Sequence, residues 1–208
     1  MMKKIDLLFR LISRFALLNL LWLGSSIIGL LILGFFPATV AMFSISRKWV
    51  RGEEDIPVIS SFWSEYKKVF VKSNVFGWGV ALIGGLLYVN YQIMLSLGTE
   101  TPFIVVLSYI FVVLLYFMFV VTLIPVAVHF EGGPLTILKR TFQFMAGRIH
   151  IAMLFMLLIW ASVYMSLAFP TAILFFSGSV LSYMLMWFFT NSLKKLEVKQ
   201  EKFKESFS

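Results

Sequence analysis

The sequence has 208 residues, of which 60% are apolar and only 13% are charged. Soluble domains are about 45–50% apolar and about 25% charged, so this composition excludes an ordinary soluble globular domain. The chain has no cysteine, which excludes disulfides, thiolate catalysis and cysteine-based metal sites. The net charge of +8 comes from basic residues beside apolar stretches, a pattern typical of membrane proteins and not of nucleic-acid binding.

Long stretches without charged residues predict membrane-spanning helices. They cover residues 15–46, 73–99, 101–130 and 149–193. A helix of about 20 apolar residues crosses a bilayer, and stretches that are apolar on every side do not fit the alternating strands of a barrel. We therefore predict an all-α membrane protein, a bundle of about six transmembrane helices. Residues 1–193 form a single multi-pass domain, and residues 194–208 form a charged cytoplasmic tail.

The first predicted hairpin contains a short second helix. The first helix runs from about Ile5 to Leu33, is not cleaved as a signal peptide, and is broken at Gly34–Pro37. The next apolar segment, Ala38–Val50, is too short for a hydrocarbon core of about 30 Å at about 1.5 Å per residue. It is either a short span or a re-entrant helix.

Two amphipathic helices are predicted to lie on the cytoplasmic surface of the membrane. The first, Ser60–Lys72, follows the polar turn 52–57 and places aromatic residues opposite its lysines. The second, Pro134 to about Gly147, is expected to use one apolar stripe, formed by Leu135, Leu138, Phe142 and Met145.

The remaining spans form two predicted hairpins. Asn74–Leu97 and Phe103–Phe130 are joined by the turn 98–102. Ile149–Ala168 and Thr171–Asn191 are joined around Pro170. The tail from Lys194 to Ser208 is expected to extend the last helix.

The distribution of basic residues predicts the topology. With six crossings, all 18 lysines and arginines lie on one side, which the positive-inside rule assigns to the cytoplasm together with both termini. If Ala38–Val50 does not return to its starting side, Lys3, Lys4, Arg10 and Arg14 move to the opposite side. The residues expected at the cytoplasmic interface are Arg47, Lys48, Arg51, Trp63, Lys67, Lys68, Lys72, Lys139, Arg140, Arg148, Lys194 and Lys195.

Small residues at helical spacing predict close helix packing. Gly77, Ala81 and Gly85 share one face, and Ser162 and Ser166 repeat the spacing. We favour packing within the bundle, with an oligomer contact as the alternative.

Polar residues within the spans are the only candidates for ligand binding, and they are weak ones. Asn19, Asn90 and Gln92 are each more consistent with structural hydrogen bonds than with substrate contacts. No ionisable residue lies in the middle of a predicted span, which argues against ion-coupled transport. We find no catalytic, metal or cofactor motif, so we expect no enzyme and no cofactor; chemistry at His129, Glu131 and His150 is the weakest alternative.

Two short motifs resemble a known family. Its N-terminal pattern is an Asn-Leu-x-Trp element followed by a Gly-Pro-Ala-Thr-x-Ala-x-Phe element. The matching residues are Asn19, Trp22, Pro37, Ala38, Thr39, Ala41 and Phe43, with Phe36 in place of the glycine. The chain is similar to the YesL-like bacterial membrane proteins, a domain of unknown function numbered 624. The resemblance implies a bacterial cell-membrane protein, often encoded beside carbohydrate ABC importers.

Two functions from different classes follow from these observations. The first is a non-enzymatic accessory or regulatory protein of oligosaccharide uptake, packed against importer subunits or a membrane sensor kinase. It would meet its partner through 60–72, 134–148 and the 194–208 tail. The alternative is a small-solute transporter or channel, with a cavity lined by Asn19, Asn90, Gln92 and the serines of 177–182.

Overall fold

The computed structural model describes residues 2–98 and 101–205, and every regular element in those ranges is a helix. The helices are α1 (Met2–Ile28), α2 (Phe35–Val50), α3 (Val58–Leu97), α4 (Phe103–His129), α5 (Pro134–Gly147), α6 (Ile149–Ala168), α7 (Pro170–Phe175) and α8 (Ser177–Glu205). Part of the predicted 98–102 turn and the last three residues of the tail lie outside the described residues. The described part of the tail continues α8, as predicted.

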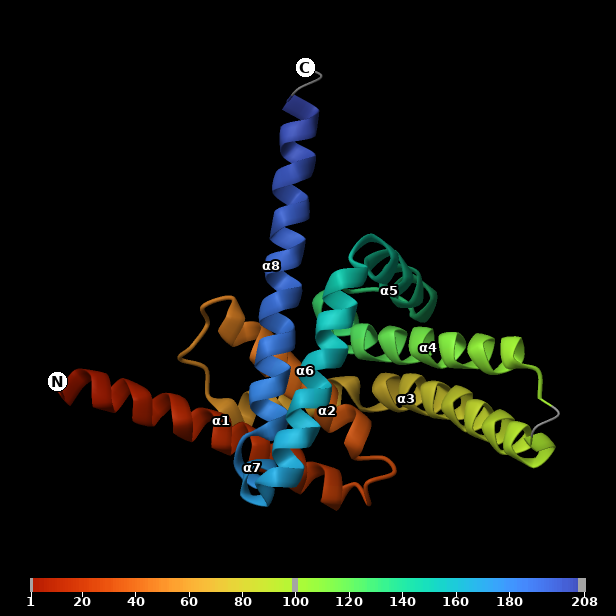
Figure 1. Ribbon diagram of the computed structural model, residues 1–208. Coiled ribbons are helices and arrows are strands. Elements are labelled where there is room, and N and C mark those ends of the chain that lie inside the picture. The colour runs from red at the N-terminus through yellow and green to blue at the C-terminus, as the bar shows by residue number, and fades with distance from the viewer. Residues whose placement is uncertain (1, 99–100, 206–208) are drawn as a thin grey trace.

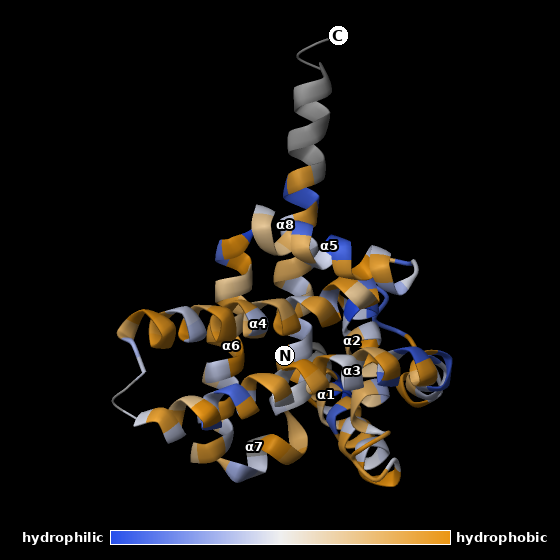
Figure 2. Ribbon diagram, turned by 90° about the vertical axis from the view of Figure 1, so that its right-hand side faces the viewer, coloured by the Kyte–Doolittle hydropathy of each residue, from blue (hydrophilic) through white to orange (hydrophobic). Residues whose placement is uncertain are grey.

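Within the described residues, four helices are long and apolar enough to cross a membrane: α1 from Phe9 onward, α3, α4 and α6. This agrees with the expected class, a helical membrane protein, whereas the predicted count of about six crossings is not confirmed. Figure 1 shows α8 upright, while α3 and α4 project together to one side. The turned view of Figure 2 also shows α4 running across the direction of α8.

The short helix α2 is the centre of the core. It packs against α1, α3, α4 and α8. Its Ala38, Ala41 and Ile45 are fully buried, and the two small alanines allow neighbouring helices to approach closely. The hydroxyls of Ser46 and Ser182 lie 2.7 Å apart in this core and join α2 to α8.

Trp22 and Thr39 of the family-like motif join α1 to α2. Trp22 Nε1 donates a hydrogen bond to Thr39 Oγ1 at 3.0 Å, and Thr39 Oγ1 donates to the Phe35 carbonyl at 2.8 Å. The turn between the helices starts at Gly29, so α1 ends five residues before the predicted boundary at Leu33. Within that turn Leu30 and Leu31 have φ values of 55° and 61°, a left-handed conformation that is uncommon for leucine.

The chain beyond the end of α2 contacts the middle of α1. The side chain of Arg14, near the middle of α1, donates to Asp55 at 2.9 Å, just beyond the end of α2. At the same end, Arg47 Nη1 donates to the carbonyl of Val128 near the end of α4 at 2.8 Å. These contacts bring the end of α2 close to α1 and α4; on which side of a membrane they lie stays a prediction.

The predicted surface helix Ser60–Lys72 and the predicted span Asn74–Leu97 are a single helix, α3, of 40 residues. The predicted separation is wrong because the polar residues at the junction bond along the helix. Ser73 Oγ donates to the Val69 carbonyl at 2.8 Å, and Asn74 Nδ2 donates to the Phe70 carbonyl at 2.9 Å and to that of Leu33 at 3.0 Å. The aromatic face points into the protein, with Phe62 and Tyr66 buried in the core.

Two further boundaries and faces differ from the prediction. The predicted span Thr171–Asn191 is broken at Phe176, between α7 and α8. In α5 the stripe that packs on the core is Ile137, Thr141 and Phe144, together with Met145 of the predicted stripe. Leu138 also packs partly against the core, whereas Leu135 and Phe142 are 82% and 59% exposed, so half of the predicted stripe faces away from the core.

Candidate functional site

Asn19, the first candidate ligand residue, is fully buried and bonded to the protein itself. Its Nδ2 donates to the carbonyls of Ile173 and Leu174 at 2.7 and 2.9 Å. Its Oδ1 accepts from the backbone N–H groups of Gly178 and Ser179 at 3.0 and 3.1 Å. The amide thus bonds the backbone groups left free where α7 ends and α8 begins.

The other polar candidates lie apart from Asn19. Asn90 and Gln92 are exposed on the projecting half of α3, where Gln92 Nε2 donates to the Tyr88 hydroxyl at 2.7 Å. Ser177, of the 177–182 segment, bonds the Ser166 hydroxyl at 2.7 Å. The structure does not bring these residues around one cavity, as the transporter alternative requires.

Small residues on α3 were predicted to form one packing face, Gly77, Ala81 and Gly85, but only Gly77 lies on the face that packs in the structure. Gly77 is buried against the Phe36 ring. From there the face that meets α4 runs through Val80, Gly84 and Leu87, since Tyr116 and Tyr109 donate to the carbonyls of Val80 and Leu87 at 2.9 and 2.8 Å. Ala81 and Gly85 are exposed, and a side chain on Gly85 would meet nothing within 4 Å. Of the predicted serine pair, Ser162 and Ser166 are both half-buried beside α8.

A basic cavity of about 480 Å³ opens between α2, α3 and α4. Five cationic side chains line it: Arg47, Lys48, Arg51, Lys68 and Lys72. Three carboxylates share the lining: Glu53, Glu65 and Glu131. The predicted interfacial basic residues therefore fall into two groups, one that lines this cavity and one that lies elsewhere. In the second group, Lys67 and Lys139 are exposed, and the Arg140 guanidinium lies 4.5 Å from the centre of the Phe130 ring.

Much of the positive charge in this cavity has no carboxylate partner. Lys48 pairs with Glu65 at 3.1 Å. Arg47 and Lys72 instead donate to the carbonyls of Val128 and Gly132, both at 2.8 Å, and a carbonyl carries no charge to neutralise them. Arg47 Nε is buried without a hydrogen-bond partner among the described residues. Burial, and then the charge of Arg51, lower the pKa of Arg47, but an arginine remains protonated in proteins.

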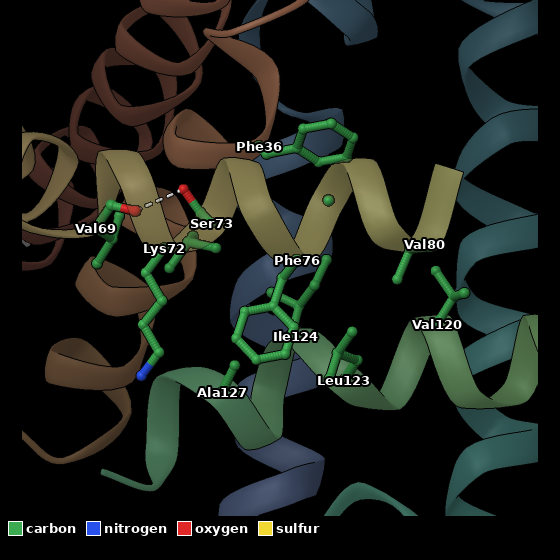
Figure 3. Close-up of a pocket in the computed structure, with 12 residues that line it drawn as sticks. Phe36, Val69, Lys72, Ser73, Phe76, Val80, Val120, Leu123, Ile124 and Ala127 are labelled. Atoms are coloured by element: carbon green, nitrogen blue, oxygen red, sulfur yellow. Dashed lines mark hydrogen bonds between the residues drawn. The ribbon is translucent and has the colours of Figure 1, made fainter. Parts of the chain in front are cut away.

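An apolar groove of about 160 Å³ continues from the basic cavity along α3 and α4. Val40, Val69, Lys72 and Ala127 line both hollows. Figure 3 shows Lys72 at one end of the groove and Val80 and Val120 at the other, with apolar side chains between them. Sequence reasoning missed this groove, although Val69, Phe76 and Val80 follow helical spacing on one side of α3.

The two histidines are not brought into a reactive cluster. His129 is half-buried, with its ring 5.3 Å from that of Phe189, whereas His150 is exposed at the start of α6. Among the described residues, no three His, Cys, Asp or Glu side chains are grouped so that they could hold a metal ion. Glu131 lines the basic cavity.

Comparison with known proteins gives relatives over most of the chain. Residues 15–91 match the family model described as "Protein of unknown function, DUF624". The chain is 33% identical to the uncharacterized protein YteU of Bacillus subtilis, over 83% of this chain and 77% of that protein. It is 30% identical to the uncharacterized protein YesL of the same organism, over 92% of this chain and 90% of that protein. No solved structure matches the chain. The chain therefore belongs to the YesL-like DUF624 family, as its two N-terminal motifs indicated.

Proposed function

We propose that this protein is a non-enzymatic accessory protein of oligosaccharide uptake in the bacterial cell membrane, with both termini in the cytoplasm. It packs against a membrane subunit of a carbohydrate importer. The link to carbohydrate uptake comes from the family resemblance, and the docking surface comes from the geometry of the α3–α4 hairpin.

The observation that carries the proposal is the exposed outer face of this hairpin. Ala81, Gly85, Tyr88 and Gln92 share one face of α3, and all four are exposed. Tyr88 and Gln92 bond each other at 2.7 Å, and Asn90 is exposed nearby. Lipid tails offer no hydrogen-bond partner to a phenol or an amide, whereas a neighbouring transmembrane helix can. We therefore assign this face, named the outer face, to a partner helix that carries polar groups.

Replacement of the small residues of the outer face tests the proposal. The double variant A81L/G85L fills the space that the partner backbone would occupy. We expect it to reduce co-purification of importer subunits in gentle detergent by about tenfold or more, a loss of about 1.4 kcal/mol or more. G79L is the matched control, because Gly79 is also exposed with nothing within 4 Å but is not one of the four residues of the outer face.

Oligosaccharide uptake in a deletion strain gives the functional readout. The native chain and G79L should restore uptake, and A81L/G85L should not. Equal co-purification with all three chains would show that the outer face is not the docking surface. Unchanged uptake in the deletion strain itself would overturn the proposed function.

A further inference from the structure

The basic cavity and the apolar groove form one continuous amphipathic hollow. The cationic part has five basic and three acidic lining residues, so its formal charge is positive. The apolar part is lined almost entirely by aliphatic and aromatic carbon, from Phe36 on α2 to Val80 on α3 and Val120 on α4. Lys72 lies where the two parts join.

This arrangement fits an amphiphile whose charged and apolar ends are close together. A guanidinium offers a fork of donors that matches phosphate oxygens, and Arg47 and Arg51 both line the cavity. The buried Arg47 Nε has no partner among the described residues, which leaves a donor to be satisfied. A free inorganic anion would use the basic part alone and leave the adjoining groove empty.

We propose that the hollow between α2, α3 and α4 is a binding site for one anionic phospholipid, with its phosphate in the basic cavity and an acyl chain in the apolar groove. Basic pockets between membrane helices hold lipid headgroups through the same chemistry. The site goes beyond the proposed function, because none of its lining residues belongs to the outer face and its ligand is a lipid and not a protein.

Native mass spectrometry of the full chain in detergent tests the site, with dioleoyl phosphatidylglycerol as the probe. We expect one tightly bound copy per chain, and binding at least about tenfold weaker for dioleoyl phosphatidylethanolamine, which has no net charge. The double variant R51Q/K68Q removes two lining cations without touching the Arg47–Val128 hydrogen bond. It should weaken phosphatidylglycerol binding about tenfold or more, since charge-assisted contacts to phosphate are among the strongest hydrogen bonds.

A matched pair of controls separates the site from general surface attraction. K67Q/K139Q makes the same charge change at two exposed lysines outside the cavity lining and should bind as the native chain does. V120F fills the groove, whereas V112F adds the same bulk to an exposed position elsewhere on α4; only V120F should weaken binding.

Three results would overturn the proposal. One is equal loss in R51Q/K68Q and K67Q/K139Q, which indicates unspecific charge attraction. Another is equal affinity for inorganic phosphate or glycerol phosphate, which indicates an anion site that does not use the groove. The third is equal binding of the two lipids.

Discussion

Asn19 shows how one buried amide can hold a break between helices. Its four hydrogen bonds reach the last carbonyls of α7 and the first N–H groups of α8, more than 150 positions along the chain. Helix ends leave such groups without partners inside the helix, and burying them unpaired costs free energy. The residue that begins the family-like motif therefore has a structural role that its own sequence neighbourhood does not show.

Replacement of this amide by a side chain of similar size should destabilise the protein. In N19L the four backbone groups lose their partner in a site of low polarity, and we expect a loss of about 2–4 kcal/mol in the free energy of unfolding. Denaturant titration of the purified protein in detergent measures it. N90L is the matched control, since Asn90 is exposed, and it should change stability by less than about 0.5 kcal/mol. Equal stability of the two variants would contradict the account.

At the scale of the elements, the turn between α1 and α2 depends on the absence of a side chain at Gly34. A Cβ there would lie 2.6 and 2.7 Å from the carbonyl oxygens of Ser25 and Ser26 and 2.9 Å from the Cα of Gly29. Its φ of −86° suits any residue, so space and not backbone conformation makes glycine necessary. The close approach is what brings α2 back along α1.

The variant G34A should separate the two helices and destabilise the fold by about 1–3 kcal/mol, the usual cost of overpacking. G24A provides the comparison, because a Cβ on Gly24 meets nothing within 4 Å and alanine is preferred in a helix interior, by up to about 1 kcal/mol. We expect opposite shifts of the thermal unfolding midpoint in the two variants. A stabilised G34A would show that the turn has room for a side chain, which contradicts the close contacts seen in the structure.

Several elements were predictable from sequence because local signals define them. Pro170 and the surrounding residues mark the turn after α6, and the bounds Ile149–Ala168 agree with the structure. The break at Phe176 was not predicted, although Ser177-Gly178 follows it, because the side chain that stabilises it, Asn19, lies on α1. The face of α5 could not be chosen either, because apolar residues occur on both sides of this 14-residue helix and only packing distinguishes them. For the same reason the sequence could not tell whether Gly84 or Gly85 meets α4.

At the scale of the whole molecule, basic side chains from three helices make contacts between segments far apart in the sequence. Arg14 meets the α2–α3 turn, Arg47 meets the end of α4, and Lys72 meets Gly132 just before α5. The class of protein and the clustering of cations followed from composition and pattern. The cavity did not, because it is formed by residues from three helices whose relative placement is a property of the fold.

This clustering predicts which positions are accessible from each side of the membrane. The native chain has no cysteine, so single cysteines report without background. E54C in the α2–α3 turn and K195C on α8 should react with an impermeant maleimide only after the cells are permeabilised, because the positive-inside rule assigns these basic segments to the cytoplasm. T101C, beside the distal end of the α3–α4 hairpin, should react in intact cells. Labelling of E54C in intact cells would place the end of α2 outside, and with it Arg47 and the basic cavity. That result would reverse the side on which the proposed lipid headgroup lies.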